Sequence, residues 1–226
     1  MNNLFKQLMP LLILFILVVT GCYRVVDGPR RDRGNLPTPG VPLHVYLVPS
    51  ALHIEDKDRM NPVDNATLLW NKRGHLPILA PDGHQVTLGE FNMVAGGAEV
   101  TCVNQGTTIA ISLQGLIPNG VYSLWIFTFK LPGFHNNFAH LIGNGVLKLT
   151  NGAENIFTAS SNGSASLSAF MHAQSLSISG SVGDCLFSEY EIHIMAAYHL
   201  NNVTHNGTPG NPDSWVTQFF FPFRGN

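Results

Sequence analysis

The segment YEIHIMAAYHL, residues 190–200, is the longest stretch of the chain in which side chains alternate in the manner of a β-strand. Its even-numbered members, from Tyr190 to Tyr198, are apolar or aromatic and share one face of an extended backbone. The odd-numbered members, from Glu191 to His199, share the other face, because successive side chains of a strand point in opposite directions. The segment therefore predicts a long strand with one face in a hydrophobic core.

Segments of the same kind precede and follow this one, at intervals of about 8–15 residues that contain turn residues. Residues 107–114 alternate between aliphatic and small polar side chains, which predicts a half-buried strand. Residues 121–129 form a nearly continuous apolar run, which predicts a central strand covered on both faces. In residues 164–170, Ala165, Leu167 and Ala169 alternate with serines. Further strands are predicted at residues 43–48, 67–70, 76–79, 85–88, 91–94, 99–104, 145–149, 156–159, 176–178 and 215–221, the last ending at Pro222.

Many short strands without helical periodicity are typical of an all-β protein. We expect residues 43–224 to form one domain, a single antiparallel β-sandwich with an immunoglobulin-like or dismutase-like Greek key. Charged residues make up only 12% of the chain and the net charge is −2, so the sequence has no basic surface for nucleic acid and we expect none as a partner.

The N-terminus carries a separate signal. One charge, Lys6, precedes an apolar run at residues 8–19, which is the length of a signal-peptide core and shorter than a membrane-spanning helix. The run ends at Val19-Thr20-Gly21-Cys22, which resembles the lipobox of bacterial lipoproteins. The resemblance implies that residues 1–21 are a lipoprotein signal peptide and that Cys22 is acylated, for example with palmitate, so that it anchors the chain in a lipid bilayer.

Residues 22–42 follow as a tether rich in proline, glycine and arginine. The expected location is the bacterial cell envelope, and Tyr23 favours the outer membrane of a Gram-negative cell, because that residue is not the Asp that retains lipoproteins in the inner membrane. If Cys22 is acylated, two of the three cysteines remain. In an oxidising compartment Cys102 and Cys185 are then expected to form a disulfide. The alternative for either thiol is a metal ligand.

Residues 113–125, LQGLIPNGVYSLW, resemble a segment of uncharacterised secreted bacterial β-sandwich domains. Residues 183–185 and 189–193 fit the same pattern, so the likeness covers residues 66–224. It implies the fold and export, and no activity. The same turn resembles that of copper–zinc superoxide dismutases and chordin-like repeats. The strand that follows it, WIFTF at residues 125–129, lacks the His-x-His pair that the dismutase copper site requires.

Histidine is the one overrepresented residue type with functional chemistry. The chain has ten, six of them between His135 and His205. Imidazole is a common ligand of copper and zinc, so a metal site could draw on His135 and His140 in the loop at residues 130–143 together with His199 and His205, or with His172. His193 and His199 cannot share an ion, because six residues of strand separate them by about 20 Å. The alternative is that these histidines are scattered over the surface and loops.

Motifs for hydrolysis or phosphate binding are missing from the sequence, so we do not expect an enzyme or a bound organic cofactor. The leading hypothesis is a lipid-anchored envelope protein whose sandwich is a binding or structural module for a protein or glycan partner. Trp215, beside a polar loop, is the best candidate for an exposed aromatic side chain. The rival hypothesis is a copper- or zinc-binding or redox protein, and a hydrolase with an unfamiliar Ser–His dyad ranks last.

Overall fold

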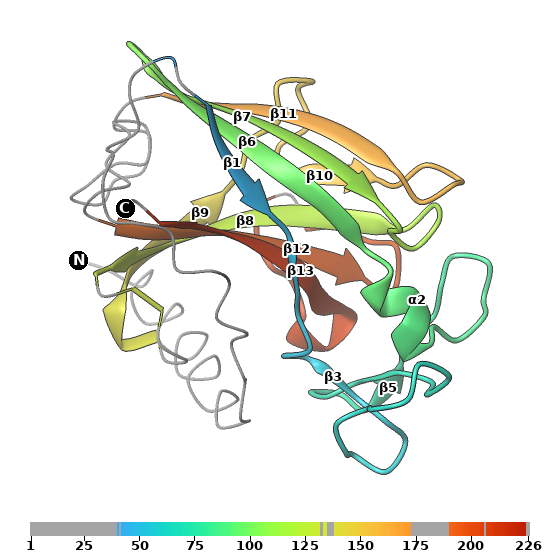
Figure 1. The fold of residues 1–226 in the computed structure, drawn as a ribbon. Coiled ribbons are helices and arrows are strands. Elements are labelled where there is room, and N and C mark those ends of the chain that lie inside the picture. The colour runs from blue at the N-terminus through green and yellow to red at the C-terminus, as the bar shows by residue number, and fades with distance from the viewer. Residues whose placement is uncertain are drawn as a thin grey trace, which may run out of the picture.

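The structure is a computed structural model that describes residues 40, 42–131, 133–134, 138–172, 190–205 and 207–224. Two antiparallel sheets lie face to face, and a smaller three-stranded sheet lies at one end of them (Figure 1). The predicted all-β sandwich is confirmed. Among the described residues, none of the helices is both long and apolar enough to cross a membrane.

The first layer is a four-stranded sheet in the order β1-β6-β7-β11. Its strands are β1 (Pro42–Tyr46), β6 (Ala95–Val103), β7 (Gly106–Gln114) and β11 (Ala165–His172). In β7 buried and exposed residues alternate, with Ile109, Ile111 and Leu113 facing the core. The sequence prediction of a half-buried strand is therefore confirmed, and the opposite face of this sheet is open to solvent.

The second layer is a six-stranded sheet in which β12 lies between β8 and β13. Its strands are β2 (Val48–Pro49), β8 (Val121–Lys130), β9 (Leu141–Val146), β10 (Ile156–Thr158), β12 (Tyr190–His199) and β13 (Trp215–Arg224). β8 pairs with β12 along one side and with β9 and β10 along the other, so it is an interior strand, as predicted. The alternation of residues 190–200 is also confirmed, because Ile192, Ile194 and Tyr198 face the core between the layers.

Two predictions about strands are wrong, one about where a strand ends and one about whether two strands exist. β13 continues past Pro222, which pairs with His193 on one side. On its other side β13 pairs with β2 only at Phe219 and Phe220, so Pro222 lies where the strand is a sheet edge and its missing N–H costs no ladder bond there. Residues 85–94 contain the helix α2 (Leu88–Asn92) instead of two strands.

Helix α2 begins with a capping box. The Thr87 hydroxyl accepts a bond from the Glu90 backbone N–H, and the Glu90 carboxylate accepts one from the Thr87 N–H at 2.8 Å. These reciprocal bonds satisfy two N–H groups that the first turn of a helix leaves without partners. The buried side chains of Leu88 and Phe91 then hold the helix against the core.

The three-stranded sheet consists of β3 (Ile54–Glu55), β4 (Trp70–Asn71) and β5 (Leu76–Pro77). It lies near α2 at the end of the sandwich (Figure 1). Two 3-10 helices complete the described elements, η1 (Phe138–His140) and η3 (Pro212–Ser214).

A buried hydrogen-bond chain joins the six-stranded sheet to α2. Tyr122 Oη accepts a bond from the Ile117 N–H and donates to Gln218 Oε1 at 2.8 Å, and Gln218 Nε2 donates to the Phe91 carbonyl. Burial raises the pKa of Tyr122 well above its usual value, so the phenol stays protonated and able to donate.

Candidate functional site

The outer face of the six-stranded sheet is unusual because its polar side chains are buried. In β12 every residue after Tyr190 is buried, on both faces. Buried polar groups need hydrogen-bond partners. The two outward-facing histidines of β12, His193 and His199, have partners of two different kinds.

The first kind is a hydrogen-bonded row of Trp125, Ser123 and His199 across β8 and β12. The Trp125 indole N–H donates to Ser123 Oγ at 2.9 Å, and Ser123 Oγ lies 2.8 Å from His199 Nε2. Burial, and to a lesser extent the charge of nearby His205, lower the pKa of His199 to about 4. The imidazole is therefore neutral at pH 7. The Ser123 hydroxyl accepts a hydrogen bond from the indole and shares a second one with His199 Nε2.

This row has the spacing of a nucleophile and its base, but it does not have their accessibility. Ser123 is 3% exposed and His199 is 1% exposed, so a substrate cannot reach the hydroxyl. The described contacts of His199 include no carboxylate that would stabilise an imidazolium. The geometry therefore describes a structural link between two strands rather than a hydrolytic dyad.

The second kind is a buried pair of His193 and Glu191, whose Nε2 and Oε1 atoms are 2.6 Å apart. The His193 ring is stacked on Phe220 at 5.1 Å, and Phe129 and Phe134 flank it at 5.1 and 5.5 Å. The Phe134 N–H also donates to Glu191 at 3.2 Å. The pair thus fastens the segment that follows β8 onto the outer face of β12.

A third polar cluster joins the turn after β4 to β13. Arg73 places one nitrogen 2.8 Å from His53 Nε2 and its guanidinium carbon 4.4 Å from the centre of the Trp215 ring. His53 Nδ1 lies 3.1 Å from Thr217 Oγ1. Burial, and then the charge of Arg73, lower the pKa of His53 well below its usual value, and burial lowers the pKa of Arg73 to about 10. Trp215 is only 6% exposed, so the prediction that it is an exposed aromatic residue is wrong: the Arg73 guanidinium packs over its ring.

Next to this cluster, His75 adopts a left-handed backbone with φ of 51°. Its Nδ1 lies 2.7 Å from the buried Glu55 carboxylate, and its ring is stacked on Trp70 at 5.0 Å. The carboxylate and the ring together hold the strained turn in place.

Among the described residues, the histidines predicted as metal ligands do not come together as a set of three, although His205 is near enough to His199 to lower its pKa. His140 Nδ1 lies 2.8 Å from the Gly133 carbonyl oxygen, His199 faces Ser123, and His205 forms an isolated β-bridge with Thr208. His135 lies outside the described residues. Within residues 40–224, apart from the segments that are not described, no three His, Cys, Asp or Glu side chains form a group that could hold a metal ion.

The cysteine predictions fall partly outside the described residues, as Cys22 and Cys185 both do. Cys102 is 4% exposed and faces the core near the end of β6. The Cys102–Cys185 disulfide therefore stays a prediction.

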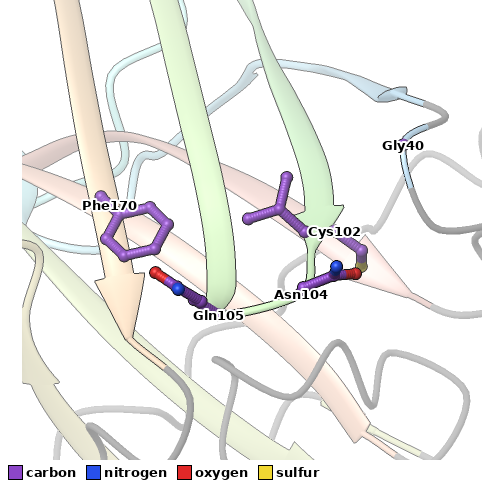
Figure 2. A pocket seen from close by; sticks show the side chains of 6 residues that line it. Gly40, Cys102, Asn104, Gln105 and Phe170 are labelled. Atoms are coloured by element: carbon purple, nitrogen blue, oxygen red, sulfur yellow. The ribbon is translucent and has the colours of Figure 1, made fainter.

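A hollow of about 540 Å³ lies beside Cys102, where β6 and β7 are joined (Figure 2). It is lined by Gly40, Cys102, Val103, Asn104, Gln105 and Phe170. Asn104 and Gln105 form the exposed tip of the hairpin between β6 and β7, and Phe170 comes from the neighbouring strand β11. Gly106, with φ of 152°, permits the close approach of the strands, because a Cβ at this position would overlap the Met171 carbonyl oxygen.

The sheet around the hollow is almost without charge. β1, β6, β7 and β11 contain no lysine or arginine, and their single carboxylate, Glu99, lies 3.5 Å from His44. Register places Pro42, Thr101, Thr108 and Phe170 in one row across the four strands. Phe170 is therefore an aromatic ring on a face of mostly small, neutral side chains, and the ring of His172 on the same face packs edge-on against it at 4.7 Å.

The sequence contained one signal for this position. In residues 164–170 the apolar Ala165, Leu167 and Ala169 define the inner face, so Phe170 falls on the face of the serines. An aromatic residue on the polar face of a strand is a sign of a contact surface that the sequence interpretation did not use.

Comparison with models of known protein families gives no match, and comparison with curated protein sequences finds no similar chain.

Proposed function

We propose that this protein is a cell-envelope lipoprotein whose β-sandwich is a binding module. The location is supported by the sequence Val19-Thr20-Gly21-Cys22 at the end of a signal-peptide-length apolar run. Acylation of Cys22 with more than one chain would give stable attachment, because each buried CH₂ contributes about 0.8 kcal/mol. Gram-negative cells would carry the protein on the outer membrane.

The observation that carries the binding function is the hollow beside Phe170 on the four-stranded sheet. A concave surface with one aromatic ring and a few polar groups is the usual form of a ligand site. Three other polar clusters of the described residues are internal links. Ser123–His199 and Glu191–His193 are buried, and Arg73 is held between His53 and Trp215.

Two further hypotheses from the sequence have less support. A hydrolytic function would need an accessible nucleophile, and Ser123 is enclosed. A copper or zinc function would need histidines that converge, and the partners of His140, His199 and His205 are a carbonyl group, a hydroxyl group and a turn.

The anchor is tested with Cys22→Ser. In cells fed a palmitate analogue, the natural chain should incorporate the label and sediment with membranes. The variant should incorporate none and leave the membrane fraction, because serine offers no thiol for the acyl transfer. Tyr23→Ser, beside the modified position, is the matched control and should be labelled normally. Labelling or membrane retention of Cys22→Ser equal to that of the control would overturn the lipoprotein assignment.

The binding module is tested by the attachment of purified mature protein, held in detergent micelles, to cell envelopes from a strain that lacks it. Attachment should saturate and should fall when Gln105 at the hairpin tip is changed to Arg, because the charge and bulk fill the hollow. Ser112→Arg, on the same sheet face but remote from the hollow, should leave it unchanged. Attachment that does not saturate, or that responds equally to both changes, would contradict a site at this position.

A further inference from the structure

We propose that the corner formed by Phe170, Thr108, Asn104 and Gln105 is a subsite for a neutral oligosaccharide. This inference rests on the proposed binding function and specifies the ligand class of the same hollow.

The geometry supplies one apolar platform and an array of neutral hydrogen-bonding groups. Figure 2 shows the Phe170 ring on β11 next to the Gln105 side chain at the tip of the β6–β7 hairpin, with Asn104 on the far side of that tip. Phe170 is partly exposed, and both amide side chains are exposed. Thr108 pairs with Phe170 in the sheet, so its hydroxyl lies beside the ring, where it donates to the Thr101 carbonyl at 3.3 Å and keeps its acceptor capacity.

This set of groups matches the two kinds of surface that a sugar ring presents. The C–H face of a pyranose is apolar and can pack on an aromatic face, while its hydroxyl groups lie around the edge and both donate and accept. Side-chain amides also donate and accept, so Asn104 and Gln105 can each bond adjacent hydroxyls. Few polar groups around one apolar contact are enough to fix the orientation of a small ligand.

The charge of the sheet favours a neutral ligand over a charged one. The four described strands contain no lysine or arginine, so they offer no cationic partner to the carboxylates or sulfates of an acidic glycan, which would lose hydration on this sheet. The single carboxylate of these strands, Glu99, lies 3.5 Å from His44 Nδ1. A protein partner is also less suited, because the core of a protein interface usually contains several aromatic residues and arginine. This corner has one phenyl ring, against which the His172 imidazole packs with the ring centres 4.7 Å apart.

The experiment uses mature protein in detergent micelles and ligand-observed saturation-transfer NMR. The probes are four neutral hexasaccharides, built of β-linked glucose, β-linked N-acetylglucosamine, α-linked glucose and α-linked mannose, with hexagalacturonate as the charged comparison. At least one neutral probe should bind with saturation, and hexagalacturonate should bind at least tenfold more weakly. Phe170→Ala should weaken the binding about tenfold or more through loss of the stacking surface, and Phe170→Tyr should restore it.

Two further variants keep the test independent of folding. Asn104→Ala with Gln105→Ala changes only exposed side chains and should also weaken binding, whereas Tyr46→Ala removes an exposed ring of the same sheet face and should not. If none of the four neutral probes saturates the protein, or if Tyr46→Ala weakens binding as much as Phe170→Ala, the oligosaccharide assignment is overturned. If Gln105→Arg still abolishes envelope attachment in that case, the binding function stands and the ligand belongs to another class. If Gln105→Arg leaves envelope attachment unchanged, the binding function at this hollow is contradicted as well.

Discussion

His199 and His53 are imidazoles that the fold keeps neutral. Each is less than 6% exposed, and burial is the main cause of the lowered pKa of both. Desolvation disfavours the charged form of a base, and the unfolded chain does not impose that cost. The two residues therefore make the stability of the domain depend on pH in the acid range.

The sign of this dependence follows from proton uptake. Between pH 6.5 and about 4 the unfolded state protonates His199 while the folded state does not, so stability falls as the pH falls. The pKa difference corresponds to a loss of up to about 3 kcal/mol from this residue by pH 4. Urea unfolding at a series of pH values should show a shallower acid dependence in His199→Gln, with the part due to His53 remaining.

His172→Gln is the control for that series, because His172 is exposed at the end of β11. Its pH profile should follow that of the natural protein. Equal acid dependence in His199→Gln and in the natural chain would show that His199 is not held neutral.

At the scale of elements, α2 depends on its N-terminal cap more than on its length. The helix has five residues, too few to be stable alone. His84 adds a bridge to the cap, with its ring nitrogens 2.6 Å from Asp82 and 3.0 Å from Glu90. Its hydrogen bond to Asp82 raises the pKa of His84, so this exposed contact stabilises the turn at pH values below 6.5 and is lost as the pH rises through the raised pKa.

Replacing Thr87 with Ala should destabilise the domain by about 1 kcal/mol, because the Glu90 N–H loses its partner and the carboxylate loses the Thr87 hydroxyl. The urea midpoint of Thr87→Ala measures this loss. Ser112→Ala, which removes an exposed hydroxyl from β7, should change the midpoint little. Equal effects of the two substitutions would mean that the capping box does not hold the helix.

At the scale of the whole molecule, Gly40, near the end of the predicted tether, lies at the proposed subsite. Gly40 lines the hollow, and its N–H donates to the Cys102 carbonyl at 2.9 Å. If Cys22 is acylated, the tether of about 20 residues limits the distance between Gly40 and the bilayer to about 65–70 Å. A ligand bound there would thus be held within that distance of the membrane.

The Cys102–Cys185 disulfide is a prediction at this same scale, because it would close a loop that includes β7, β8 and β11. Peptide mapping by mass spectrometry without reduction should recover the linked pair. Cys185→Ala should lower the free energy of unfolding by about 4–5 kcal/mol in the chain-entropy model. Alkylation of both thiols in the denatured, unreduced protein would show that the bond is not formed.

Most of the fold could be predicted from the periodicity of the side chains along the strands. Residues 107–114, 121–129 and 190–200 each became the strand that their alternation or continuous apolarity predicted. Residues 85–94 failed because short apolar runs fit both a strand and a helix. There the Thr87–Glu90 capping box, a local hydrogen-bond pattern, decided the outcome.

The sequence by itself therefore determined the all-β class and which face of each long strand is apolar, because both follow from side-chain period and need no partner. Only the tertiary structure decided which polar residues meet. His199 with Ser123 and Phe170 with the hairpin tip are pairings between strands far apart in the chain, and they depend on sheet order and register. Register between distant strands is fixed by packing across the whole sandwich. No local sequence pattern could therefore predict that His199 forms a buried link with Ser123, or where the hollow lies.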